Sequence, residues 1–146
     1  MHVRTPCVGM CSTTFGDFVC RGCKRWLHEV IDWNAYDDAN KHVVVERLRL
    51  QRDACVAGFV TIENEATLRC AAADAGLTAG NSASELLLAL LRRNFSVAEI
   101  GCSVPAGALL DGRAHPDGRA LYLAIDAELL VRAQAGYEHG YRVLVR

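Results

Sequence analysis

The sequence of 146 residues lacks the features that mark membrane, secreted and general nucleic-acid-binding proteins. No segment approaches the roughly 18 consecutive apolar residues that a membrane-spanning helix requires. The first residues contain no apolar core of the kind that a secretory signal carries, so we expect a cytoplasmic protein. The formal net charge of −1 also does not supply the basic field expected of a nucleic-acid binder.

Common catalytic signatures are absent as well. The chain has no Gly-x-Ser-x-Gly elbow, no phosphate-binding P-loop and no His-Glu-x-x-His motif. Asp111, His115 and Asp117 form a carboxylate–imidazole cluster that could act in acid–base catalysis, and His139 lies beside Glu138. Asp-Gly turns and exposed histidines account for the same residues without chemistry. We therefore favour a non-enzymatic role and keep a catalytic site around His115 as the weakest alternative.

Cysteine, in contrast, is abundant, and four of the seven cysteines fall within the first 23 residues. These four follow the spacing Cys-x3-Cys-x8-Cys-x2-Cys and are Cys7, Cys11, Cys20 and Cys23. An odd number of cysteines in a reducing compartment argues against a disulfide framework. Two close pairs separated by a short loop can direct four thiolates at one point, as Zn(II) and Fe–S clusters require. The sequence therefore predicts one four-cysteine metal centre and leaves zinc or an Fe–S cluster open.

The residues around the four cysteines suit such a centre. Gly22 leaves the backbone free to direct amide groups at sulfur, and Lys24 and Arg25 offset the negative charge of four thiolates. His2 and His28 lie near enough in sequence to replace one thiolate, although we favour surface or half-buried histidine at both positions. The four cysteines are therefore the predicted ligands.

The other three cysteines, Cys55, Cys70 and Cys102, are scattered along the chain. Their neighbours are largely apolar, and in such surroundings cysteine behaves as a small buried hydrophobe with a raised thiol pKa. We expect these thiols to be inert and disfavour a second thiol site or a redox sensor.

Hydrophobic periodicity predicts a mainly helical α+β fold with two domains, residues 1–53 and 54–146. The first domain is expected to contain a metal knuckle over 5–25 and two helices. One helix covers 26–33 with Trp26, Leu27, Val30, Ile31 and Trp33 mostly on one face, and the other begins after the cap Asp37 and ends near Asp53.

The second domain is expected to be a small α+β unit. One predicted helix ends at Gly76 and turns Leu68, Cys70 and Ala71 inward. The other predicted elements are a strand over 57–62, a helix from the cap Ser82 to Asn94, a turn capped by Ser96, a loop over 111–120, a helix from the cap Asp126 to Gly136, and a closing strand over 141–146.

The cysteine-rich segment also resembles a small bacterial family known as domain of unknown function 1289, whose members are often labelled predicted iron–sulfur proteins. The resemblance covers residues 5–52, where the family's Pro-Cys-x-Gly-x-Cys and Cys-x-Gly-Cys stretches recur with a basic residue, a glutamate and a tryptophan. The matching residues are Pro6, Cys7, Gly9, Cys11, Cys20, Gly22, Cys23, Arg25, Glu29 and Trp33. The resemblance implies an Fe–S cluster on the same four cysteines, whereas their spacing alone also fits zinc.

These patterns predict a small cytoplasmic four-cysteine metal-binding protein that acts as an adaptor or regulatory interaction module. The metal would stabilise an N-terminal domain of about 50 residues, because so short a chain buries little apolar area. The second domain would bind a protein partner. The alternative is an Fe–S protein that transfers electrons or senses oxidant beside a partner enzyme.

Overall fold

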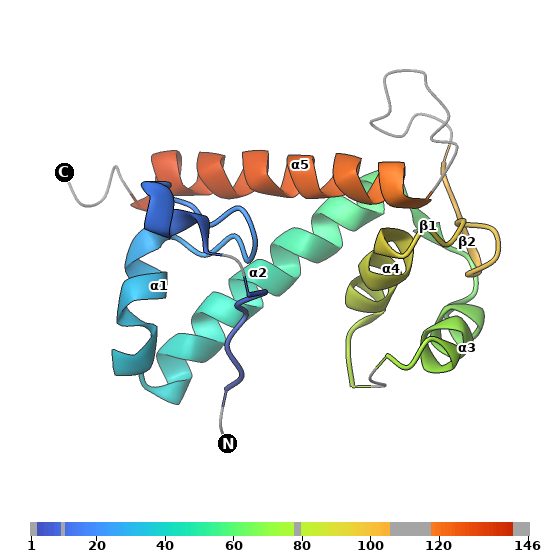
Figure 1. The fold of residues 1–146 in the computed structure, drawn as a ribbon, viewed down its shortest axis with the longest axis horizontal. Helices are drawn as coiled ribbons and strands as arrows, with labels where there is room; N and C mark the ends of the chain where they lie inside the picture. The colour runs from blue at the N-terminus through green and yellow to red at the C-terminus, as the bar shows by residue number, and fades with distance from the viewer. Residues whose placement is uncertain (1–2, 10, 78–79, 106–117, 142–146) are drawn as a thin grey trace. The chain divides into compact units, whose positions relative to one another are not determined.

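The computed structural model of the chain describes residues 3–9, 11–77, 80–105 and 118–141 (Figure 1). Across these residues it has the expected mainly helical α+β fold, with one two-stranded antiparallel sheet. The helices are α1 (Leu27–Asp32), α2 (Asp38–Phe59), α3 (Glu65–Asp74), α4 (Ala83–Arg92) and α5 (Gly118–Gly136), and the strands are β1 (Thr61–Ile62) and β2 (Cys102–Ser103). None of the described helices is both long and apolar enough to cross a membrane.

The chain packs into two compact units whose boundaries fall inside α2 and α5. The first unit comprises residues 1–52 and 128–146, and the second comprises residues 53–127. The proposed domain boundary after residue 53 concerns independent folding, so it stays a prediction.

In the first unit, local capping begins α2 where the sequence predicts. The Asp37 side chain accepts a hydrogen bond from the backbone N–H of Asn40 at 2.8 Å, which satisfies one of the free amides of the first turn. Apolar side chains of α2 then pack in one cluster with Trp33, which directly follows α1. The buried members of this cluster are Val3, Trp33, Val44 and Leu48, and Tyr36 and Val45 pack against them.

Two expectations about α1 and α2 are wrong. Ile31 was expected on the apolar face of α1, but its side chain is 69% exposed, and Glu29 is buried in its place. The second helix continues to Phe59, so half of the strand predicted over 57–62 is helical, and β1 contains Thr61 and Ile62. Burial of Val56 and Phe59, three residues apart on one helix face, explains the extension.

In the second unit, α3 and α4 lie beside the β1–β2 pair (Figure 1). The Asn64 side chain accepts the N–H of Thr67, and the Ser82 hydroxyl accepts the N–H of Glu85, so both helices start at polar caps. Fully buried leucines of α4 form much of the core against α3. The buried side chains of these two helices are Leu68, Ala72, Ser84, Leu86, Leu87, Leu90 and Leu91.

The helix expected to begin at Asp126 begins eight residues earlier as α5, at Gly118. Its buried side chains follow a four-residue spacing that continues on both sides of Asp126, so the aspartate does not interrupt the helix. These buried residues are Leu121, Ile125, Leu129 and Ala133. Residues 118–120, expected at the end of a loop, form the start of α5, whereas Asp111, His115 and Asp117 and most of the predicted closing strand lie outside the described residues.

Gly101 allows a close backbone approach that a larger residue would prevent. Its φ is +75°, and a Cβ at this position would lie 2.8 Å from the carbonyl oxygen of Asn64 and 2.9 Å from Cβ of Thr67. We expect Gly101→Ala to lower the free energy of unfolding by about 3 kcal/mol, because backbone strain and overpacking act together. Urea denaturation followed by circular dichroism measures this loss.

Gly76→Ala is the matched control for that substitution. Gly76 has a similar φ of +78°, but nothing lies within 4 Å of its Cβ position. This variant should lose only the backbone contribution, about 1 kcal/mol. Equal losses in the two variants would show that the contact with Asn64 and Thr67 has no energetic effect.

Candidate metal centre

The four N-terminal cysteines lie on two loops that meet at Ser12. Cys7 and Cys11 precede a short 3-10 helix, Ser12–Phe15, and Cys20 and Cys23 belong to the turn that leads into α1. The Ser12 hydroxyl accepts the backbone N–H of Arg21 at 2.8 Å. The backbone N–H of Ser12 is itself hydrogen-bonded to the Cys20 thiol. Two hydrogen bonds in opposite directions therefore hold the loop after Cys11 against the Cys20–Cys23 turn.

The second cysteine pair occupies a tight hairpin. Val19 and Trp26 pair as an antiparallel bridge, and the Cys20 N–H donates to the carbonyl oxygen of Arg25 at 2.9 Å. Lys24 closes the turn with φ of 68°, a conformation that side-chain-bearing residues rarely adopt. Its ammonium group donates to the backbone carbonyls of Arg21 and Gly22. These bonds offset the cost of the left-handed backbone and fix the separation of the two cysteines.

Glycine amides are directed at the first sulfur of each pair. The Gly9 N–H donates to Sγ of Cys7 at 3.4 Å. Gly22, which is likewise two residues after a cysteine, donates its backbone N–H to the Cys20 thiol. The two loops thus repeat one local arrangement, in which a flexible residue lets the chain fold its amide back onto sulfur.

The second sulfur of each pair has a side-chain partner. Sγ of Cys11 lies 2.8 Å from Oγ1 of Thr13. Arg25 donates from Nε to Sγ of Cys23 at 3.3 Å. All four sulfurs are therefore hydrogen-bonded, and a cation lies beside one of them.

These contacts change the acidity of the second pair. Burial would raise the pKa of the Cys20 thiol, but backbone N–H groups of Cys23, Ser12 and Gly22 and the Cys23 side chain together lower the pKa to about 7. For Cys23, burial has the larger effect and raises the pKa, although the Arg25 guanidinium partly offsets it. Cys20 is thus the thiol of this pair that ionises more readily near neutral pH.

The structure brings Cys20 and Cys23 together but does not gather all four sulfurs at one point. Within the described residues, no three His, Cys, Asp or Glu side chains lie close enough to share a metal ion. Cys7 is exposed, Cys11 is partly buried and Cys20 is buried. The four-cysteine ligand set therefore stays a prediction. The partly buried His28 ring lies 5.8 Å from the Trp26 ring, and His2 lies outside the described residues.

An ion pair between Glu29 of α1 and Arg47 of α2 supports the hairpin. Glu29 is 3% exposed, and its two carboxylate oxygens accept hydrogen bonds from Arg47 at 2.5 and 2.7 Å. The same carboxylate accepts the backbone N–H of Trp26 at 2.9 Å and so caps α1. The Arg47 guanidinium also lies 3.9 Å from the centre of a Trp26 ring. One glutamate thus joins the hairpin, α1 and α2.

Trp33 supports the hairpin on another side. The Arg25 guanidinium carbon lies 4.9 Å from the centre of its ring, and Lys41 Nζ lies 5.7 Å from it. Arg25 therefore contacts both a cysteine sulfur and the tryptophan of the apolar cluster. The partners of Lys41 and Arg47 lie on other parts of the chain, so the sequence pattern of α2 alone does not indicate them.

These supporting residues lie in a segment that resembles a family of proteins. Residues 5–52 match the family model of Protein of unknown function (DUF1289). The expected resemblance is confirmed for this N-terminal third, which contains the four cysteines, Arg25, Glu29 and Trp33. No curated protein and no solved structure matches the chain.

Outside the DUF1289-like segment, two of the three remaining cysteines are buried as expected. Cys55 and Cys102 belong to the core, and burial, with a smaller effect of Glu63, raises the pKa of Cys102 to about 11. The expectation is wrong for Cys70, which is exposed. On α3 the buried positions are Leu68 and Ala72, and a residue two positions from each points to the opposite side of the helix.

We expect Glu29→Ala to lower the free energy of unfolding of the first unit by about 3 kcal/mol. The substitution leaves the Arg47 guanidinium with no carboxylate and removes the cap of α1. Thermal and urea denaturation measure the change.

Glu46→Ala provides the control, because it removes the same charge from an exposed ion pair with Arg49 on α2. Exposed pairs contribute about 0–1 kcal/mol, so this variant should remain close to the unmodified protein. A similar small loss for Glu29→Ala would contradict a structural role for the buried pair.

Proposed function

We propose that Cys7, Cys11, Cys20 and Cys23 hold one metal centre that cross-links the two N-terminal loops. The observation that carries this proposal is the set of hydrogen bonds to sulfur, in which glycine amides serve Cys7 and Cys20. Amide donors stabilise thiolates, which are the form of cysteine that binds metal. A thiol that serves only to fill a core needs no such donors.

The electrostatics and the size of the unit also support a metal centre. The Arg25 guanidinium beside Cys23 offsets part of the charge of a thiolate site. Among the described residues, the apolar cluster around Trp33 has four buried members, and metal binding would add to the free energy of folding that this cluster supplies. When bound, the metal supplies a covalent-like link between loops that the chain otherwise joins through Ser12.

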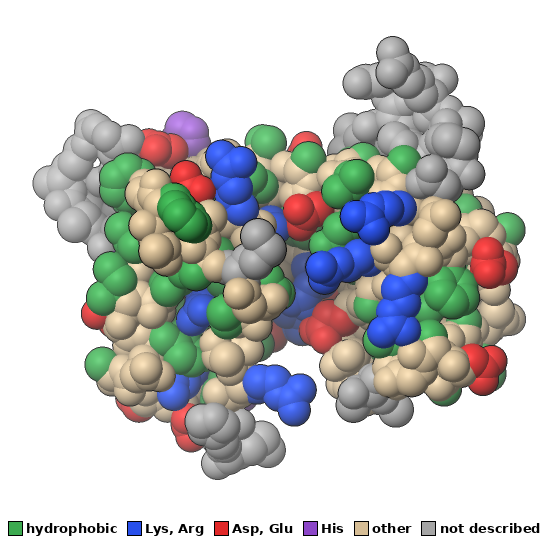
Figure 2. Space-filling model, in the orientation of Figure 1, with side chains coloured by type: hydrophobic (Ala, Val, Ile, Leu, Met, Phe, Trp, Pro, Cys, Tyr) green, Lys and Arg blue, Asp and Glu red, His purple; other side chains and the backbone are tan. Residues whose placement is uncertain are grey.

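We further propose that this centre supports an interaction surface in an adaptor or regulatory protein. Hydrophobic side chains reach the surface of the molecule among polar ones (Figure 2). Phe15, immediately after the cysteine-bearing loop, is 89% exposed, and Phe18 and Val8 on the same two loops are also exposed. Large apolar side chains on the loops that the metal would order are typical of a protein-binding surface.

An Fe–S protein that transfers electrons or senses oxidant is the second candidate. Hydrogen bonds to cluster sulfurs and exposure to solvent both set the reduction potential of such clusters. The donors around the four cysteines and the exposed position of Cys7 are the features that favour this alternative. Both candidates use the same four ligands, so the identity of the metal separates them.

Metal content and the visible spectrum of protein purified without oxygen test the centre. We expect one centre per chain, either colourless zinc or a brown Fe–S cluster with acid-labile sulfide. Replacing any one of the four cysteines with Ser should weaken metal binding by more than about 100-fold, beyond the effect of losing an outer partner. Each variant should also loosen the first unit, as measured by amide hydrogen exchange.

Cys70→Ser is the control, because Cys70 is exposed on α3 and lies outside the DUF1289-like segment. Its metal content should equal that of the unmodified protein. Full metal retention in all four ligand variants, or a folded protein that holds neither zinc nor iron, would contradict the proposed centre.

A photoreactive amino acid at position 15, introduced in the source cell, tests the interaction surface. We expect one dominant protein adduct, which is lost when Cys20 is replaced with Ser. Leu123, 56% exposed on α5, is the control position and should give no adduct. Absence of an adduct at position 15, or the same adducts at both positions, would argue against an adaptor role.

A further inference from the structure

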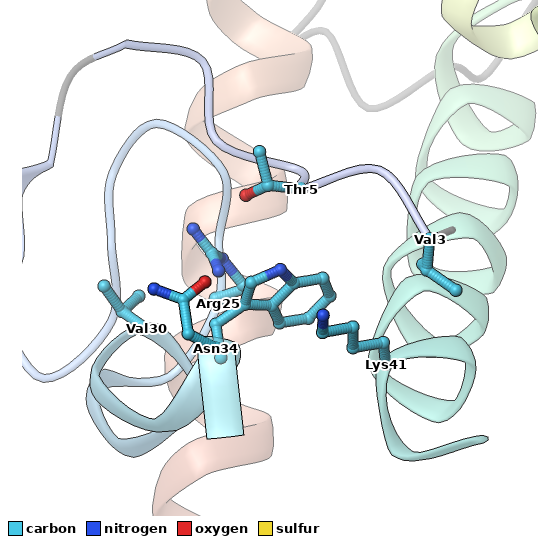
Figure 3. A pocket seen from close by; sticks show the side chains of 7 residues that line it. Val3, Thr5, Arg25, Val30, Asn34 and Lys41 are labelled. Atoms are coloured by element: carbon cyan, nitrogen blue, oxygen red, sulfur yellow. The ribbon is translucent and has the colours of Figure 1, made fainter. Parts of the chain in front are cut away.

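A pocket of about 310 Å³ opens in the first unit and is lined by residues that include Arg25, Trp33 and Lys41 (Figure 3). Its polar lining comes from Thr5, Arg25, Asn34 and Lys41, and its apolar lining includes Trp33 and Val30. The lining contains two cations and no carboxylate. The volume is at the lower end of the range for small-molecule sites.

Arg25 is a buried cation in the lining of this pocket. The residue is only 4% exposed, and its recorded hydrogen bond runs from Nε to Sγ of Cys23. Its terminal amino groups have no hydrogen-bond acceptor among the described residues, and the side chain lines the pocket (Figure 3). The guanidinium contributes donors and a positive charge to this lining, which an anion can use.

Lys41 adds a second positive charge to the lining of the pocket. Arg25 and Lys41 both lie within 6 Å of the Trp33 ring centre, at 4.9 and 5.7 Å, and neither forms an ion pair with a described carboxylate. In Figure 3 their side chains reach the pocket from different elements, the turn before α1 and the first turns of α2. The aromatic ring offsets part of this repulsion, and an anion would offset more of it.

The donors at the rim indicate which anion fits. The Thr5 hydroxyl oxygen already accepts the Cys7 N–H at 3.3 Å, so its own proton is available to a ligand. Asn34 contributes an amide at the opposite rim. A carboxylate brings two oxygens and one negative charge, whereas a phosphate group brings up to four oxygens and close to two negative charges, which match the two cations of the lining better.

We propose that this pocket binds a phosphate group, with Arg25 and Lys41 as the charged ligands and Thr5 and Asn34 as hydrogen-bond donors. None of the four cysteines lines this pocket, although Arg25 also donates to Sγ of Cys23, so the phosphate site does not rest on the identity of the metal. The phosphate belongs either to the free ion or to a small phosphorylated molecule, since the pocket has room for about ten waters, more than one phosphate fills.

Nuclear magnetic resonance of the full chain, as purified, tests the proposal. Inorganic phosphate is titrated at low chloride, and the indole N–H of Trp33 and the Nε–H of Arg25 are followed. We expect both signals to shift with one saturating curve, while the Trp26 indole, which does not line the pocket, stays unchanged. Acetate should bind at least tenfold more weakly. No shift with phosphate, or equal affinity for acetate, would overturn the proposal.

Lys41→Gln and Arg49→Gln form a matched pair of variants. Each removes one positive charge from α2, but Arg49 lies outside the pocket and pairs with Glu46. Loss of one charge-assisted bond in Lys41→Gln should raise the dissociation constant for phosphate by about tenfold. Arg49→Gln should change it less than about twofold, because exposed charges are screened. Equal weakening by both variants would reduce the binding to nonspecific attraction and overturn the site.

Glycerol 3-phosphate in place of inorganic phosphate distinguishes the two sources. Tighter binding of the ester supports a phosphorylated small molecule, and tighter binding of the free ion supports phosphate itself. Binding of neither compound would count against the pocket as a phosphate site.

Discussion

The buried ion pair between Glu29 and Arg47 is the interaction on which the first unit depends. Among the described residues, the apolar cluster around Trp33 has four buried members, and apolar burial by itself favours no particular orientation of the loops. The carboxylate of Glu29 accepts the backbone N–H of Trp26 at the start of α1 and also binds the Arg47 guanidinium. That guanidinium in turn lies 3.9 Å from the centre of a Trp26 ring. Directional polar contacts thereby supply the orientation that extensive apolar packing provides in a larger domain.

The cysteine loops are likewise held by directional polar contacts. Each sulfur meets a hydrogen-bond partner drawn from its own loop or the adjacent turn, and glycine two residues after the first cysteine of each pair makes this possible. Amide–sulfur bonds favour the thiolate, so the loops favour the state that binds a soft cation. An isolated chain can form these local bonds, but only a ligand shared between loops would compensate the repulsion of four thiolates.

Local signals in the sequence predicted much of the fold. Caps at Asp37 and Ser82 begin helices where expected, because a side chain bonding its own backbone requires no distant partner. The end of α2 and the beginning of α5 were missed, since burial of Phe59 and Leu121 depends on packing within the second unit. Among site residues, spacing identified the four cysteines, whereas the pairing of Glu29 with Arg47 spans 18 residues and leaves no local signature.

Arg25 illustrates why the residue type matters beside a thiolate. Its Nε donates to the sulfur of Cys23, its guanidinium carbon lies 4.9 Å from the centre of the Trp33 ring, and the residue lines a pocket that Lys41 also lines. Only a planar fork of donors can serve three directions together, so an ammonium group at this position would lose at least one contact. The adjacent Lys24 performs a different task, because its point charge gathers the carbonyls of Arg21 and Gly22 beneath the turn. Lys24 thus closes the hairpin, whereas Arg25 connects the sulfur of Cys23 to Trp33.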